Sequence, residues 1–464
     1  MLKFLRKVFA PEPHKPRLPE DEIKRQYPGK RWRILEATFI GYASYYLLRD
    51  NIKLATSEME VALSYSKEQL GTIMGVTAIA YGLGKFFMGA LSDRSNPRVF
   101  IVVGLLLSTI FNFLFGAAGD VNFSLGGKEF HIAVYDIHLY LWALNGVVQG
   151  MGWPPCGRSM GHWFSENERG FTFSIWNTSH NVGGAIIGII AAEAVKRFGG
   201  WEYAFYVPGA ITAIMCVYLF FRMMDTPQSQ GLPPIEEYRN DYSKKSMNQE
   251  SHERELTFKE LFFDYVLFNK FVWILAIANF FAYITRYSML DWGPTYLREA
   301  KGVSITKGSF AVVAIEVGGI PSTILLGYLS DKLGGRRGRI AVYCMIPIIV
   351  AYALLPFVPA NDYALAIDLF LMFIVGLFIY PVINFITIMA LDLTSKKAIG
   401  IAAGFIGLFG YIGKAANSWM SGKLVDDLTP VVGSSQAWNA PLYLATASGI
   451  IAAGCLMLTW KHKA

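Results

Sequence analysis

Long apolar runs alternate with short polar segments along almost the whole chain. A run of about 20 apolar residues is long enough to cross the hydrocarbon core of a bilayer as a helix. Twelve such runs are predicted to span a membrane, over residues 34–56, 68–91, 99–118, 137–162, 170–195, 201–222, 271–295, 308–329, 339–357, 364–391, 397–422 and 439–460. The pattern therefore predicts an all-α membrane protein that is embedded in the lipid bilayer.

One long polar insertion, from Asp225 to about Lys259, interrupts this pattern in the middle of the chain. It is rich in proline, serine, asparagine and charged residues, which is typical of a connecting segment. It separates two sets of six predicted helices. We therefore expect an N-terminal tail at 1–33, a six-helix bundle at 34–222, a linker at 223–270 and a second six-helix bundle at 271–464.

The composition agrees with a membrane protein and excludes several other classes. Hydrophobic residues make up 53% of the chain and charged residues 17%, whereas typical soluble domains have about 25% charged residues. The net charge of +7 is spread over the ends of apolar runs, so no nucleic-acid partner is expected. The four cysteines have no paired spacing, which argues against disulfides and a bound metal. No nucleotide-binding loop and no nucleophile–base pair stands out, so we expect neither a cofactor nor enzymatic activity.

The distribution of positive charge predicts the orientation in the membrane. Ten lysines and arginines precede the first predicted helix, and the connections at 92–98 and 330–339 are also basic. The connections near 58–60 and 120–136 carry mostly acidic residues. Because lysine and arginine concentrate in cytoplasmic loops, both termini are predicted to lie in the cytoplasm.

Two short motifs recur in the two halves. GALSDRSNPR at Gly89–Arg98 is echoed by GYLSDKLGGRR at Gly327–Arg337. We expect the paired residues Asp93 and Arg94, and their counterparts Asp331 and Lys332, to form a conformational loop, in which the aspartate caps a helix or pairs with nearby arginines. The alternative is an ordinary basic loop that only fixes orientation.

An arginine inside a predicted span also recurs in each half. Tyr46-Leu-Leu-Arg49 matches Tyr283-Ile-Thr-Arg286, and the offset between the arginines differs by one residue from the offset between the motif aspartates. A charge at the bilayer centre costs about 2.5–3.5 kcal/mol, and guanidinium groups bind phosphate or carboxylate with two parallel hydrogen bonds. We therefore predict an anion clamp with one arginine from each half. The alternative pairs Arg49 with Asp50 and Arg286 with Asp291, although neither acid has the i+3 or i+4 spacing of helix neighbours.

Other polar side chains in the predicted spans complete the candidate site. His180 titrates near neutrality, as phosphate does, although it could equally be a neutral core histidine. Phenol groups can donate to a phosphate while remaining largely apolar, although tyrosines also serve as simple packing residues. Lys85 and Glu316 are either ligand-binding residues or halves of ion pairs between the bundles. The remaining candidates to bind an anion are Asn177, Tyr42, Tyr46, Tyr283, Tyr380 and Tyr411.

Several segments together indicate a family. Two six-helix halves are the plan of major facilitator transporters. GYASYYLLRDN, SDRSNPRVF, QGMGWPPCGR, WNTSHNVGG and RYSMLDWGPTYL resemble the bacterial organophosphate:phosphate antiporters, and DTPQSQGLPPIEEYRNDY resembles their glycerol-phosphate branch. The resemblance implies a protein of the bacterial inner membrane that works as a monomer and exchanges inorganic phosphate for glycerol 3-phosphate. Alternatives within the family are a carrier of hexose phosphate or phosphoglycerate, and a transporter-like sugar-phosphate receptor.

The resemblance also transfers roles to residues, with two departures. It places the phosphate-binding arginines at Arg49 and Arg286, and it matches His180, Lys85, Asp291 and the candidate tyrosines to family positions. The family usually has Arg-Lys where this chain has Arg49-Asp50, and glycine where it has Lys414. We interpret the departures as an exchange of charge, in which Asp50 removes a positive charge from the cavity wall and Lys414 restores one. Asp50, Lys414, Asp291 and Glu316 are therefore predicted to modulate the charge of the site.

Overall fold

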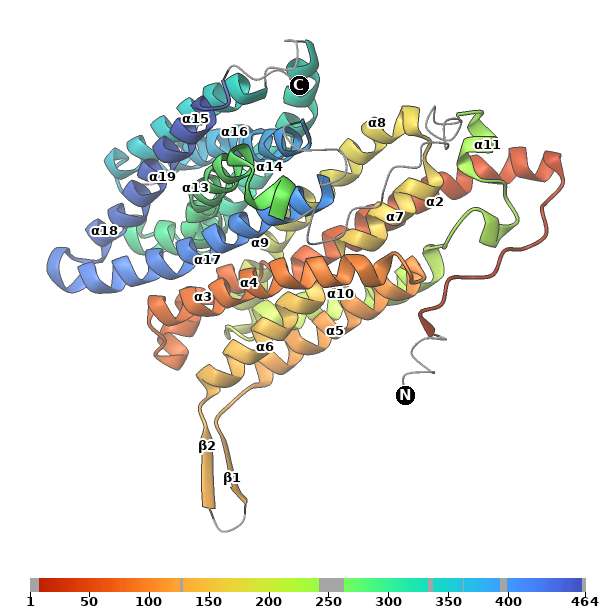
Figure 1. Ribbon diagram of the computed structural model, residues 1–464. Helices are drawn as coiled ribbons and strands as arrows, with labels where there is room; N and C mark the ends of the chain where they lie inside the picture. Colours follow the sequence, from red (N-terminus) through yellow and green to blue (C-terminus); the bar gives the residue numbers. More distant parts are fainter. Residues whose placement is uncertain are drawn as a thin grey trace.

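The computed structural model describes residues 8–125, 128–241, 263–332, 337–361, 363–392 and 399–460. Helices dominate these ranges (Figure 1). One antiparallel hairpin of β1 (Val121–Leu125) and β2 (Lys128–Ile132) projects from one end of the molecule. The sequence analysis expected only an acidic loop at this position. Strands this short, with mostly exposed side chains, leave no clear apolar pattern in the sequence.

The first half contains six predicted spans, three of which are broken into two helices. The span expected at 34–56 forms α2 and α3, the span at 137–162 forms α6 and α7, and the span at 170–195 forms α8 and α9. The helices of this half are α2 (Glu20–Leu47), α3 (Ile52–Leu63), α4 (Lys67–Ser92), α5 (Pro97–Ala117), α6 (Val134–Gln149), α7 (Trp153–Trp163), α8 (Glu166–Asn177), α9 (Ser179–Phe198) and α10 (Tyr203–Arg222). The prediction of three continuous helices was therefore wrong, and α2 begins well inside the expected N-terminal tail.

The second half follows a connection that contains two short helices, η1 (Gln228–Gln230) and α11 (Ile235–Arg239), and a π-helical turn, η2 (Phe263–Leu267). Its elements are α13 (Lys270–Lys301), α14 (Ile305–Lys332), α15 (Arg337–Leu354), η3 (Leu355–Phe357), α16 (Leu365–Asp392), α17 (Ile399–Val432), α18 (Ser434–Ala437) and α19 (Asn439–Met457). Within the described ranges, seven helical stretches are long and apolar enough on their own to cross a membrane. Each of the twelve predicted spans coincides with a helix or a broken pair of helices.

The break between α2 and α3 is held open by asparagine side chains. The carbonyl oxygen of Leu48 accepts hydrogen bonds from the amides of Asn112 (3.1 Å) and Asn145 (3.0 Å). Asn51 in turn donates to Asn112 (2.8 Å) and to the carbonyl oxygen of Ala204 (3.0 Å). Non-helical backbone survives at membrane depth only where its polar groups are satisfied by protein or water. These amides therefore allow the chain to leave the helix around Arg49 and Asp50.

The two halves pack together through α4 against α17 and through α9 against α14. Glycines allow the close approach, because a side chain at Gly71 would overlap the Ser418 carbonyl, and one at Gly184 would press on the Glu316 carboxyl group. Small residues at helix interfaces serve the same purpose in other membrane proteins.

The hairpin projects from one end of the helices (Figure 1), and the first and last described segments contact helix ends away from it. The Asn96 amide, between α4 and α5, donates to the Phe9 carbonyl oxygen, and Arg339 at the start of α15 donates to the Trp460 carbonyl oxygen. We call this the terminal end of the molecule and the other the hairpin end.

Candidate functional site: a chamber between the halves

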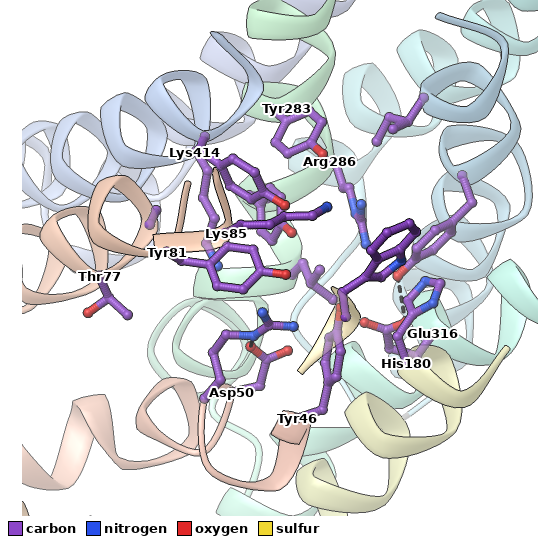
Figure 2. A pocket seen from close by; sticks show the side chains of 18 of the residues that line it. Tyr46, Asp50, Thr77, Tyr81, Lys85, His180, Tyr283, Arg286, Glu316 and Lys414 are labelled. Carbon is purple, nitrogen blue, oxygen red and sulfur yellow. Dashed lines mark hydrogen bonds and ion pairs between the residues drawn. The ribbon is translucent and has the colours of Figure 1, made fainter. Parts of the chain in front are cut away.

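A chamber of about 190 Å³ lies between the two halves (Figure 2). The first half contributes residues of the α2–α3 junction, α4, α7, α8 and α9, and the second half residues of α13, α14, α16 and α17. The structure brings all ten predicted anion-binding residues to its wall: Tyr42, Tyr46, Arg49, Lys85, Asn177, His180, Tyr283, Arg286, Tyr380 and Tyr411. Pockets for drug-sized ligands have volumes of roughly 300–1,000 Å³, so this chamber suits a small ligand.

Arg49 lies in the break between α2 and α3 and is enclosed by aromatic rings. Its guanidinium carbon is 4.0 Å from the ring centre of Tyr46 and 4.6 Å from that of Tyr81. Its Nε is 3.9 Å from an Asp50 carboxylate oxygen, at the limit of an ion pair. The alternative pairing with Asp50 thus exists only as a long contact, and most of the guanidinium remains without an acidic partner.

Arg286 is buried, with 8% of its surface exposed. Its guanidinium carbon lies 4.3 Å from the ring centre of Tyr380 and 5.0 Å from that of Tyr287. Its Nε has no hydrogen-bond partner, and no carboxylate in the described part of the chain forms an ion pair with it. An isolated buried cation is costly, and an anionic ligand would remove that cost.

Asp291 belongs to a separate ion-pair cluster, so the alternative pairing of Arg286 with Asp291 was wrong. Lys53 lies 3.0 Å from Asp291 and 3.2 Å from Asp50, and Ser418 donates a hydrogen bond to Asp291 (2.9 Å). This cluster joins α3 of the first half to α13 and α17 of the second. The sequence analysis missed Lys53, although its i,i+3 spacing from Asp50 was a usable signal.

Glu316 connects the halves by a second contact. Its Oε2 accepts hydrogen bonds from the Tyr380 hydroxyl (2.5 Å) and from the Asn181 amide of α9 (2.8 Å). An ionised carboxylate is well suited to accept two such bonds.

His180 also lies on the wall of the chamber, near Tyr380 and Tyr46. Its ring lies 5.5 Å from that of Tyr380 and 5.8 Å from that of Tyr46. Its Nδ1 donates to the Asn177 carbonyl oxygen. In the neutral ring this leaves Nε2 as the acceptor nitrogen.

Lys85 and Lys414 approach the chamber from α4 and α17 (Figure 2). The Lys85 ammonium lies 5.0 Å from the ring centre of Trp153, and that of Lys414 lies 4.3 Å from the ring centre of Tyr287. The wall also contains residues that the sequence analysis did not select, among them Tyr81, Trp153 and Asn384. Only the tertiary structure separates these aromatic and amide residues from many similar ones elsewhere.

The contacts of the repeated loop motif differ from those that the sequence analysis expected. Asp93 and Arg94 are exposed at the end of α4 and form no ion pair with the residues that the structure covers. Asn96 instead caps α5 by accepting from the Arg98 amide (2.9 Å), and Arg158 donates to the Ser92 and Ser95 carbonyl oxygens. Asp331 and Lys332 end α14, and their side chains lie outside the described residues.

The chamber leads toward the terminal end and is closed toward the hairpin end. A second cavity of about 330 Å³ shares Asn177 and Asn384 with the chamber and continues between α8, α14 and α16. At the hairpin end, contacts bridge the halves: Glu58–Arg298 (2.7 Å), Lys67–Glu299 (3.2 Å), Thr56–Thr295 (2.7 Å) and Glu193–Thr306 (2.8 Å). Among the residues that the structure describes, the cavities therefore extend toward the terminal end, and contacts between the halves close the hairpin end.

Two six-helix halves that enclose a basic chamber, open at one end, define a membrane transporter. Residues 38–417 match the Major Facilitator Superfamily. The chain is 41% identical to the glycerol-3-phosphate transporter of Bacillus subtilis over 98% of both proteins. It is 39% identical to the glycerol-3-phosphate transporter of Haemophilus influenzae over 98% of this chain and 97% of that protein.

More distant relatives extend the comparison. The membrane sensor protein UhpC of Escherichia coli is 34% identical over 87% of this chain and 88% of that protein. A bacterial homologue of the human lysosomal transporter Spinster shares the fold with a TM-score of 0.69 at 14% identity, over 93% of this chain and 97% of that one. The chain belongs to the Major Facilitator Superfamily, where its relatives group it with the organophosphate transporters.

Proposed function

We propose that the protein imports glycerol 3-phosphate across the bacterial inner membrane in exchange for inorganic phosphate. The observation that carries this proposal is the meeting of Arg49 and Arg286, from opposite halves, in one chamber where Arg286 has no acidic partner among the residues that the structure describes. Both guanidinium groups offer the paired donors that match phosphate oxygens. The relatives named glycerol-3-phosphate transporters support the choice of organophosphate.

Exchange follows from the charges of the chamber. Without a ligand, the two arginines repel each other and oppose closure of the halves around them. A bound phosphate group attracts both and lowers the free energy of the closed arrangement, as alternating access requires. Because each crossing then needs a bound anion, inward movement of one organophosphate is coupled to outward movement of one phosphate.

The orientation follows from the basic connections. With both termini in the cytoplasm, the chamber opens toward the cytoplasm here and is closed toward the outside. One chain supplies both halves of the clamp, which fits transport by a monomer. In this proposal Lys85, His180, Asn177 and the chamber tyrosines contact the substrate beside the arginines.

The test is uptake of labelled glycerol 3-phosphate into liposomes that contain the purified protein. We expect uptake only when inorganic phosphate is inside, with weaker inhibition by glucose 6-phosphate than by unlabelled glycerol 3-phosphate. Uptake into liposomes that contain no phosphate would contradict exchange. Binding of an organophosphate without any flux would contradict transport and favour a sensor, as the UhpC relative is named.

A further inference from the structure

The charged side chains that line the chamber give it a net charge that can be counted. Four positive side chains line it in the described part of the chain: Arg49, Lys85, Arg286 and Lys414. Two negative side chains, Asp50 and Glu316, line it as well. With Glu316 ionised, as its two accepted hydrogen bonds favour, and His180 neutral, two positive charges remain in excess. Lys53 and Asp291, which lie behind the wall and pair with each other, add no net charge.

Asp50 and Lys414 carry opposite charges on opposite halves of the chamber wall, and each acts electrostatically on the other. Asp50 is 3% exposed, and its carboxylate faces Lys53 at 3.2 Å and Arg49 at 3.9 Å. It thereby offsets positive charge beside the clamp. Without the Asp50 carboxylate, Lys53 would have Asp291 as its one remaining ion-pair partner among the described residues.

The surroundings of Lys414 differ from those of Asp50, which has ion-pair partners. Among the residues that the structure describes, its ammonium forms no hydrogen bond and no ion pair, and its close neighbour is the Tyr287 ring. Lys53 and Arg286 approach the same ring at 5.8 Å and 5.0 Å. Asp50 and Asp291 are the acids that act electrostatically on Lys414, and Lys53 already pairs with both.

We propose that Asp50 and Lys414 together set the net charge of the chamber and so determine which substrates it accepts. The inference rests on the proposed function and narrows its substrate class. A phosphate monoester that carries two negative charges and an uncharged remainder, such as glycerol 3-phosphate, matches an excess of two positive charges. A phosphate ester with an additional carboxylate, such as 3-phosphoglycerate, brings a third negative charge that nothing in the wall neutralises.

The physical reason is the low polarity of the chamber. Charges interact more strongly in a protein interior than in water, so one uncompensated charge weakens binding measurably. Asp50→Asn keeps the side-chain shape and raises the excess to three. Lys414→Gln lowers it to one, and the double variant restores two.

The experiment measures binding through thermal stabilisation of the purified protein by glycerol 3-phosphate and by 3-phosphoglycerate. A ligand that binds only the folded state stabilises it by RT ln(1 + [L]/Kd), so the rise in melting temperature at known ligand concentrations gives the dissociation constant. Each variant gives a ratio of the two dissociation constants. Lys24→Gln, which removes an exposed positive charge at the start of α2, is the matched control.

We expect wild type to prefer glycerol 3-phosphate and Asp50→Asn to shift the ratio about tenfold toward 3-phosphoglycerate. Lys414→Gln should shift it about tenfold the other way, Lys414→Arg should leave it within about threefold, and the double variant should return it to within about threefold of wild type. If Asp50→Asn does not fold, the two Lys414 variants still decide the question. An unchanged ratio in Lys414→Gln, or a double variant that does not recover the ratio, overturns the proposal.

The binding and transport experiments separate failure of the proposed function from failure of the charge rule, by which we mean the role proposed for Asp50 and Lys414. If glycerol 3-phosphate binds with the expected ratios but is not exchanged for phosphate in liposomes, antiport is wrong and the charge rule stands. If exchange occurs but the ratios do not follow charge, the charge rule is wrong and antiport stands.

Discussion

At the scale of single residues, the proposed phosphate clamp depends on the difference between a guanidinium group and any other cation. Arg49 is held between the rings of Tyr46 and Tyr81, which orient its plane without neutralising its charge. A planar group with fixed donors can bind two phosphate oxygens at once, whereas an ammonium acts as a point charge. The identity of the residue therefore matters beyond its charge.

Arg49→Lys tests this difference. We expect uptake of glycerol 3-phosphate to fall to background although the charge is kept, because the paired hydrogen bonds to phosphate are lost. Charge-assisted hydrogen bonds contribute about 1.5–3 kcal/mol each, so affinity should fall at least about tenfold. Arg25→Lys, at an exposed site near the start of α2, is the control in the same liposome assay. Wild-type uptake by Arg49→Lys would exclude the clamp.

A second residue-scale prediction concerns acid stability at the terminal end. Burial alone would raise the pKa of Glu168, in the first turn of α8, but hydrogen bonds from Arg31, the Ser165 backbone and Arg239 outweigh burial and hold that pKa at about 2. An unfolded glutamate has a pKa of about 4.3. Because the pKa is lower in the folded state, Glu168 stabilises the fold above about pH 4.3, and this contribution is lost as the pH falls toward 2.

Thermal unfolding in detergent at a series of pH values checks this sign. Because Glu168 and its partner Arg239 are partly exposed to solvent, which screens the pair, the contribution should be on the order of 1 kcal/mol or less. The melting temperature of wild type should therefore fall slightly more between pH 4.5 and 2 than that of Glu168→Gln. Glu166→Gln, an exposed neighbour in the same turn, should follow wild type. Parallel curves for wild type and Glu168→Gln would remove this ion-pair network as a source of stability.

At the scale of elements, the break between α2 and α3 is what places Arg49 in the chamber. The break survives because the amides of Asn112 and Asn145 occupy the carbonyl oxygen of Leu48, which a continuous helix would have used. These asparagines belong to α5 and α6, so two neighbouring helices stabilise the irregular segment. The same principle explains why the segment can carry adjacent charged residues inside the membrane.

Asn112→Ala is predicted to destabilise this element. The change removes one donor to Leu48 and the acceptor for the Asn51 amide. A buried polar group without a partner costs about 1–3 kcal/mol, so the melting temperature should fall, and glycerol 3-phosphate affinity should fall with it because Arg49 loses its support. Both are measured by thermal unfolding with and without ligand. Asn122→Ala, in the exposed hairpin, is the control. Lower stability with unchanged affinity would show that the break is not needed to position Arg49.

At the scale of the whole molecule, the structure is held closed at the hairpin end by close packing and by ion pairs between the halves. Gly71 of α4 faces the backbone of Ser418 on α17, and Glu58 pairs with Arg298 nearby. Alternating access requires these same contacts to separate when the chamber opens on that side. A change at this interface should therefore alter the balance between conformations.

Gly71→Ala introduces a methyl group where the Ser418 carbonyl lies, and we expect it to favour opening at the hairpin end. Spin labels at Val61 and Val431, exposed sites on α3 and α17 with 84% and 77% exposure, report the distance between the halves. Cys455, the half-buried cysteine, would be replaced by serine for labelling. The distance distribution should shift to longer values. Gly89→Ala, where nothing lies within 4 Å, is the matched control, and identical distributions for the two variants would contradict the prediction.

The sequence by itself determined the class of the protein, its number of spans and most of the residues at its site. Apolar runs of bilayer length, a polar connection in the middle and an arginine repeated in each half are properties of the linear chain, because they follow from transfer of side chains into lipid. The ten residues predicted to bind an anion were chosen from such local signals. Their presence in one chamber agrees with that choice, and their roles remain predictions.

Tertiary structure alone decided where the helices break and which charges pair. The breaks depend on hydrogen bonds from helices that are distant in sequence, such as those from Asn112 and Asn145 to Leu48. The pairing of Asp291 with Lys53, and not with Arg286, depends on how α3 packs against α13. The sequence selected Lys414, but only the structure showed that the nearby acids Asp50 and Asp291 pair with Lys53 instead. Periodicity in a sequence reports which side chains enter the membrane, but partner choice depends on distances between helices.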